Sequence, residues 1–149
     1  MWVALLQSFG QLVTSKLCHD QITSLPLSSA VAEFEKLLHQ QGFLRIAGVD
    51  EAGRGACAGP LVVAAAVLPT EHPKLNLCAD SKSLSEKDRE ARFEVIIDLA
   101  LAFSIVEISS VEIDQFGLHE CNLTGMRRAV AALEIVPDFI LTDGYAIEV

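Results

Sequence analysis

Two apolar segments separated by a glycine-rich turn constrain the fold of this chain more than any other feature. The first segment is 43–50, in which Leu44 and Val49 are expected to be buried, and the second is the unbroken apolar run Leu61–Leu68. Runs of this length that are rich in valine and bounded by glycine or proline are typical of strands. Because a glycine turn joins them, we predict that they form an antiparallel pair.

Helical and strand patterns alternate along the rest of the chain. Helices are predicted from Ser28 to Gln41, where Gly42 follows, from an N-cap at Ser85 to Ala100, and over 110–133 with a break near Gly117; strands are predicted over 103–108 and 139–142. The helices are predicted from apolar residues that recur at helical spacing and from serines or glycines near the helix ends. The order strand, strand, helix, strand, helix, strand predicts an α/β domain with a mixed sheet.

The bulk composition indicates one globular domain. The chain has 149 residues, 51% of them hydrophobic and 21% charged. Residues 1–27 show no clear period and are interpreted as an N-terminal extension of unknown role, with the domain over 28–149. The longest apolar run has eight residues, far fewer than the ~20 that cross a bilayer. No Lys or Arg precedes the apolar start Met1–Leu6, so a secretory signal fits poorly and a cytoplasmic protein is expected.

The net charge of −9 is unevenly distributed along the chain. Residues 93–149 carry two basic and ten acidic side chains, whereas residues 50–92 carry six basic and seven acidic ones. The middle of the chain therefore keeps enough basic side chains to contact a phosphate backbone, although the overall charge disfavours tight binding to nucleic acid.

Acidic side chains lie at the ends of two predicted strands. Asp50 and Glu51 come where the first apolar segment reaches the surface, and Asp143 ends the strand 139–142. If these strands are neighbours, the three carboxylates meet, and without a cation they would repel by roughly 4 kcal/mol per pair at 4 Å. Oxygen ligands with no nearby Cys or His set favour Mg²⁺ or Mn²⁺ over zinc. Such a cluster is what metal-assisted phosphodiester hydrolysis needs.

Four motifs follow one another between about residue 44 and the last residue. They are Ile46–Pro60, with its Asp50-Glu51-Ala52-Gly53-Arg54-Gly55, then Asp80–Ser85, Glu112–Val130 and Pro137–Gly144. Together they resemble ribonuclease HII, the type 2 ribonuclease H family. The resemblance implies a ribonuclease H-like mixed sheet flanked by helices. It also implies an endoribonuclease that hydrolyses the RNA strand of RNA–DNA hybrids, or ribonucleotides embedded in DNA, leaving 3′-hydroxyl and 5′-phosphate ends.

The resemblance also implies roles for individual residues. Asp50, Glu51 and Asp143 match the family's catalytic ligands for Mn²⁺ or Mg²⁺; Gly53, Arg54 and Gly55 match the loop whose backbone contacts the ribose 2′-OH; Lys82 matches a lysine near substrate phosphate. Taken alone, Asp143-Gly144 is more often a turn, and Lys82 is nearly as well explained as an ordinary solvated lysine. Because the motifs occur in order, they favour the functional roles of Asp143 and Lys82. We also expect a monomer that does not bind membranes.

The sequence departs from the family pattern after the last motif. Members of the family continue into a helix with a fourth metal-binding aspartate and a later tyrosine, whereas this sequence ends at Val149 and has only Glu148 as an acid after Asp143. We therefore expect a partial catalytic domain without the C-terminal helices. We also expect the isolated chain to have little or no nuclease activity.

Two alternative functions are open at this point. One is a non-catalytic remnant that keeps part of the fold and binds nucleic acid weakly. The other is a dinucleotide-binding oxidoreductase, because Gly53, Gly55 and Gly59 nearly match a phosphate-binding loop. The glycine spacing has one residue too many, and two acids before the loop would repel a pyrophosphate, so this alternative fits poorly.

Overall fold

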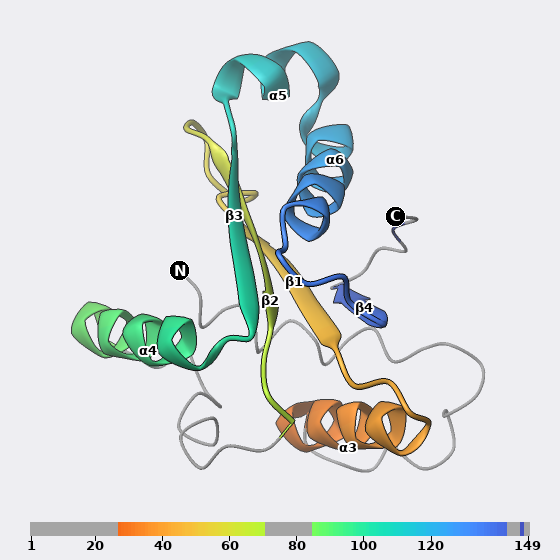
Figure 1. Cartoon of the computed structure of the whole chain (residues 1–149). Helices are drawn as coiled ribbons and strands as arrows, with labels where there is room; N and C mark the ends of the chain where they lie inside the picture. Colours follow the sequence, from red (N-terminus) through yellow and green to blue (C-terminus); the bar gives the residue numbers. More distant parts are fainter. Residues whose placement is uncertain (1–26, 71–84, 143–146, 148–149) are drawn as a thin grey trace.

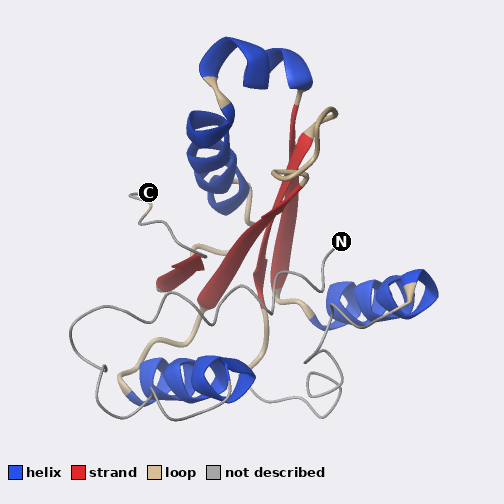
Figure 2. Ribbon diagram, turned by 180° about the vertical axis from the view of Figure 1, so that it is seen from behind, coloured by secondary structure: helices blue, strands red, loops and turns tan. Residues whose placement is uncertain are grey.

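The computed structural model describes residues 27–70, 85–142 and 147, with side chains described from Phe34 onward. Its helices are α3 (Leu27–Gln40), α4 (Glu86–Leu99), α5 (Ser110–Phe116) and α6 (Leu118–Ala131), and its strands are β1 (Ile46–Ala52), β2 (Leu61–Val67), β3 (Ala102–Ile108) and β4 (Phe139–Thr142). Helix α5 lies beyond one end of the sheet, and α3 and α4 lie near the other end (Figures 1 and 2). No helix in these ranges is long and apolar enough to cross a membrane.

The strands form a mixed sheet in the order β3-β2-β1-β4. Strands β1 and β2 pair in antiparallel orientation, as do β2 and β3, whereas β1 and β4 run parallel. Both the predicted antiparallel pair and the predicted mixed sheet are therefore confirmed. Because β1 and β4 run the same way and are neighbours, their carboxyl ends lie at the same edge of the sheet.

The main hydrophobic core lies between the sheet and α6. Its buried members are Val49, Leu61, Val63, Ala65, Ile108, Cys121, Met126, Ala129 and Val130. Helix α6 approaches the sheet closely at Gly125, where an added Cβ would lie 2.7 Å from Cγ2 of Val63 and 3.4 Å from Cγ1 of Ile108. On the opposite face, Phe93 of α4 packs against Ala64 and Ala66. The sheet is thus covered by α6 on the face that carries Val49.

Several element boundaries differ from those predicted. Strand β1 begins at Ile46 rather than at residue 43 and continues to Ala52, two residues past Asp50. Leu44, which was expected to be buried, is 67% exposed, because its segment bonds to a side chain rather than to the sheet. The predicted helix ends are confirmed: the Ser85 hydroxyl accepts a hydrogen bond from the Asp88 N–H, and Gly117 separates α5 from α6.

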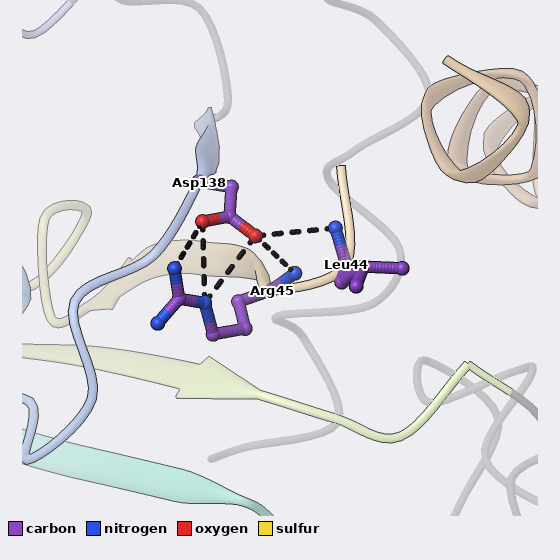
Figure 3. Close-up of polar contacts among 3 residues, drawn as sticks. All are labelled: Leu44, Arg45 and Asp138. Carbon is purple, nitrogen blue, oxygen red and sulfur yellow. Dashed lines mark hydrogen bonds and ion pairs between the residues drawn. The ribbon is translucent and has the colours of Figure 1, made fainter. Parts of the chain in front are cut away.

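Residues before β1 and β4 are joined by a polar contact, which we call the Arg45–Asp138 clip (Figure 3). Oδ2 of Asp138 accepts hydrogen bonds from the backbone N–H groups of Leu44 (3.2 Å) and Arg45 (3.0 Å). The Arg45 guanidinium donates to the same carboxylate from Nε, at 3.2 Å to Oδ1, and also from Nη2. In return, the Arg45 carbonyl accepts from the Asp138 N–H at 2.8 Å. The clip therefore satisfies backbone groups of both strands where they begin.

A Gly125→Ala substitution should destabilise the protein in spite of the better helix propensity of alanine. The new methyl would meet Val63, whose β-branched side chain is fully buried and cannot turn away easily. Overpacking of this kind costs about 1–3 kcal/mol, against a helix gain of roughly 1 kcal/mol. We expect a net loss of about 1 kcal/mol in the free energy of unfolding by urea denaturation. In a Val63→Ala background the same substitution should be neutral or stabilising; an equal loss in both backgrounds would contradict this packing.

Asp138→Asn should destabilise the protein in a pH-dependent way. Hydrogen bonds from the Arg45 side chain, and then from the Arg45 and Leu44 backbones, lower the pKa of Asp138 from 3.8 to about 2. A lowered folded-state pKa stabilises the fold above the unfolded pKa, and this contribution disappears as pH falls from about 4 to about 2. Melting temperatures of the two proteins should differ most near neutral pH and converge over that window. A difference that does not change with pH would contradict the assignment.

Candidate metal and nucleic-acid site

The central strand of the sheet carries the two adjacent acids. Strand β1 lies between β2 and β4, and it includes both Asp50 and Glu51. The sequence predicted that the strand surfaces at Asp50, but Asp50 is only 6% exposed, and β1 runs on to Ala52 in pairing with β2. Burial of a carboxylate is costly unless it is paired or hydrogen-bonded, so an acid at this position needs a compensating interaction.

The two carboxylates leave β1 on opposite faces. Val49 belongs to the core under α6, and side chains alternate along a strand, so Glu51 is directed to the α6 side and Asp50 to the other side. The Asp50 Oδ1 atom accepts a hydrogen bond of 2.9 Å from the Glu51 backbone N–H. This bond holds the Asp50 carboxylate close to the chain at the carboxyl end of β1.

Glu51 has an incompletely satisfied carboxylate. Its side chain is 11% exposed, and Oε1 lies 3.4 Å from Nη1 of Arg54, whose own side chain is 40% exposed. The other oxygen, Oε2, is buried and has no hydrogen-bond partner among the residues that the structure describes. A buried carboxylate oxygen without a donor is destabilising, and a hard cation is a ligand that would satisfy it. The Glu51 carboxylate therefore fits a divalent metal ion.

The register of β1 and β4 leads to the third predicted acid. Val49 pairs with Thr142, which is the last pair among the described residues and lies one position before Asp50 on β1 and before Asp143 in the sequence. The condition set from the sequence, that these two strands be neighbours, is met. Asp143 itself, like Lys82, lies outside the described residues, and the roles predicted for both stay predictions.

The predicted glycine loop lies at the surface directly after β1. Gly53, Arg54 and Gly55 are all exposed. Gly53 has φ +98°, and a Cβ there would lie 2.7 Å from the carbonyl oxygen of Pro60, so only glycine fits this turn. The loop leads into strand β2 and not into a helix, which removes the strand-loop-helix geometry that a dinucleotide-binding loop requires.

The structure also shows a buried polar residue that the sequence analysis did not single out. Asn122 of α6 is fully buried, and neither atom of its amide has a partner in the described ranges. It lies one helical turn before Gly125 and Met126, on the face of α6 that covers the sheet. The sequence did contain a signal for a buried polar residue, because Asn122 interrupts an otherwise apolar helical stripe.

No metal-binding cluster of three or more His, Cys, Asp or Glu side chains is complete within residues 27–70, 85–142 and 147. Asp50 and Glu51 are adjacent residues at the carboxyl end of β1 in this part of the chain, and their side chains leave the strand on opposite faces. The three-carboxylate cluster predicted from the sequence depends on Asp143 and is not tested by these residues.

Together, the sheet and its acid-bearing central strand define an α/β protein with a ribonuclease H-like arrangement. The family model described as ribonuclease HII matches residues 47–148. The chain therefore belongs to the ribonuclease HII family. This confirms the family resemblance inferred from the four motifs.

Curated relatives and solved structures agree with this assignment. Ribonuclease HII of Frankia casuarinae is 54% identical over 115 residues, covering 76% of this chain and 48% of the relative. That of Rhodococcus erythropolis is 50% identical over 121 residues, covering 80% and 54%. The chain thus spans about half the length of these relatives.

Two solved structures are similar to the chain. The crystal structure of ribonuclease H2 from Pyrococcus horikoshii OT3 matches with TM-score 0.61 and 32% identity, covering 70% of this chain and 52% of that one. The structure of Bst-RNase HIII in complex with Mn²⁺ matches with TM-score 0.52 and 24% identity, covering 79% and 41%, and it supports the fold alone.

Glu51→Gln should remove stabilisation of the chain by Mn²⁺. A ligand at 100 times its Kd stabilises a folded protein by about 2.7 kcal/mol, so wild-type melting temperature should rise in Mn²⁺. The amide of glutamine has one weaker oxygen donor and no charge, and the rise should be largely lost. Glu94→Gln, the same change on the exposed surface of α4, is the matched control and should keep the full rise. Equal rises in both variants would exclude Glu51 as a ligand.

Proposed function

We propose that this protein is an endoribonuclease that hydrolyses the RNA strand of RNA–DNA hybrids, or ribonucleotides embedded in DNA, by metal-assisted phosphodiester cleavage. The observation that carries the proposal is the acid pair at the carboxyl end of β1, in which Asp50 is buried and Glu51 partly buried, with Glu51 Oε2 lacking a partner in the described part of the chain. Membership of the ribonuclease HII family gives the pair its chemical context.

Asp50 and Glu51 would hold the divalent ion, with Asp143 as a third ligand from the neighbouring strand. All three donors are carboxylate oxygens, which suit Mn²⁺ or Mg²⁺. When bound, such ions lower the pKa of an attacking water and stabilise the leaving oxygen. The protein's own contribution is to keep the ligand oxygens in place: Asp50 is held by the Glu51 N–H, and β1 is paired on both sides.

The exposed glycine loop is the proposed site of substrate recognition. Without side chains at Gly53 and Gly55, a ribose can approach the backbone closely enough for its 2′-OH to be hydrogen-bonded. The Arg54 guanidinium is 40% exposed beside Glu51 and can reach a phosphate from there. Lys82 is proposed as a second phosphate contact. These contacts would select RNA over DNA at the cleaved position.

The wider setting of the proposal follows from the sequence. Residues 28–149 would form the catalytic unit, with 1–27 as an extension, and the protein would act as a monomer in the cytoplasm. A second candidate function is weak binding of a hybrid without cleavage. The two candidates differ in whether the phosphodiester bond is broken, so one assay separates them.

Asp50→Asn should abolish cleavage while leaving hybrid binding nearly intact. The assay is a single-turnover gel measurement, with excess protein, Mn²⁺ and a DNA duplex that contains one ribonucleotide. Loss of a metal ligand should lower the rate by about 100-fold or more, equivalent to ~3 kcal/mol of transition-state stabilisation. Asp98→Asn on exposed α4 is the matched control and should cleave as wild type does.

Three results can be told apart in this assay. Cleavage by the wild type and the control, lost in Asp50→Asn, supports the endoribonuclease. Binding of the duplex without cleavage by any of the three proteins supports the second candidate. Absence of both, or cleavage that survives Asp50→Asn, overturns the proposed function.

A further inference from the structure

The Arg45–Asp138 clip lies at the end of the sheet away from the proposed metal site. Arg45 immediately precedes β1, and Asp138 immediately precedes β4. The two residues are 93 positions apart in the chain. The paired residues Ile46 and Phe139, and the last pair, Val49 and Thr142, have this same separation. The clip therefore aligns the two strands in the register that the whole β1–β4 pairing follows.

That separation connects the clip to the acids. One position beyond Val49 and Thr142, the two sequences have Asp50 and Asp143, which are again 93 positions apart. Side chains on neighbouring strands share a face only in the correct register, and a slip by one residue would turn every β4 side chain to the other face. The alignment of the strands at their amino ends therefore determines which acidic residues lie side by side at their carboxyl ends.

Few contacts define the register of strand β4 in the described residues. It has four residues, lies at an edge of the described sheet and pairs there with β1, and Ile140 and Leu141 pack against the two apolar clusters. The clip adds hydrogen bonds in both directions, since Asp138 accepts from Leu44 and Arg45 while the Arg45 carbonyl accepts from Asp138. The Phe139 ring contributes at the same end, with its centroid 5.3 Å from that of Phe43. A carboxylate that accepts from a forked guanidinium and two amides fits one alignment only.

The side-chain ion pair of the clip is partly exposed to solvent. The side chains of Arg45 and Asp138 are 48% and 28% exposed, and ion pairs at such sites contribute little to folding. The Arg128–Glu112 ion pair, which links α6 to α5, has a similar exposure of 49% and 33% but joins no strands. A comparison of variants in these two ion pairs therefore separates a role in strand alignment from a general effect of surface charge.

We propose that Arg45 and Asp138 are positioning residues. They set the β1–β4 register so that the carboxyl ends of the two strands, where the proposed metal ligands lie, are side by side. The inference rests on the proposed function for its consequence at the metal, but the alignment itself can be tested without metal. Asp138 makes more of the clip's bonds than the Arg45 side chain does, so its loss should have the larger effect.

Cysteine pairs report the register directly. Val49→Cys with Thr142→Cys joins paired positions, whereas Val49→Cys with Ile140→Cys joins positions that meet only after a slip of two residues. In a Cys57→Ser background, which removes an exposed thiol, oxidation and mass spectrometry give the yield of each disulfide. With the clip intact, the 49–142 disulfide should dominate. Adding Asp138→Ala should lower its yield and raise that of 49–140, while adding Arg128→Ala should change neither.

Metal affinity is the second readout. Calorimetric titration with Mn²⁺, at a temperature where circular dichroism shows every variant folded, should give a Kd about 10-fold weaker for Asp138→Ala. Arg45→Ala, which keeps the backbone bonds to Asp138, should fall between Asp138→Ala and the wild type. Arg128→Ala should bind as the wild type does. A residue with a merely structural role would lower the melting temperature but leave the Kd of the folded protein unchanged.

The two readouts separate the inference from the proposed function. An unchanged disulfide pattern in Asp138→Ala overturns the positioning role, whatever the metal data show. A wild type that binds no Mn²⁺ overturns the metal site, while a disulfide pattern altered by Asp138→Ala still supports the register role. A changed pattern together with the graded loss of Mn²⁺ affinity supports both.

Discussion

The parallel pairing of β1 with β4 is the interaction on which the rest of this structure depends. These strands are separated by almost the whole described chain, yet four consecutive residue pairs join them. The pairing places the central acid-bearing strand between two partners, up to the residue before the buried Asp50. It also brings the last residue of β4 beside Val49, immediately before the acids. Without this pairing, Asp50 and Glu51 would be an ordinary solvated strand end.

Helix α6 supports the same arrangement from one face. Gly125 lets the helix approach Val63, the residue that pairs with Glu51 across β1 and β2. The resulting core covers the Glu51 side of the sheet, which is why a buried carboxylate oxygen with no partner among the described residues is chemically informative there. Burial of the acid and close packing of the helix are thus two consequences of one interface.

Much of the fold could be predicted because its signals are local. The Leu61–Leu68 run predicted β2, the Ser85 hydroxyl predicted the start of α4, and Gly117 predicted the break between α5 and α6; all three are confirmed. The exposure of Leu44, the extension of β1 past Asp50 and the Arg45–Asp138 clip could not be predicted. The first and the last depend on contacts between residues 93 or 94 positions apart, and the extension of β1 depends on its pairing with β2; local patterns encode neither. Within the site, Asp50 and Glu51 were located by motif, whereas the buried Asn122 was overlooked within an apolar stripe.

In the proposed metal site, carboxylates from two distant segments share divalent ions at the carboxyl ends of β1 and β4. Anomalous diffraction at the manganese absorption edge, from crystals of the chain grown with Mn²⁺, tests this claim most directly. We expect an anomalous peak for a manganese ion that is coordinated by carboxylate oxygens of Asp50, Glu51 and Asp143 together. A peak elsewhere, or Asp143 turned away from the other two acids in the presence of the metal, would contradict it.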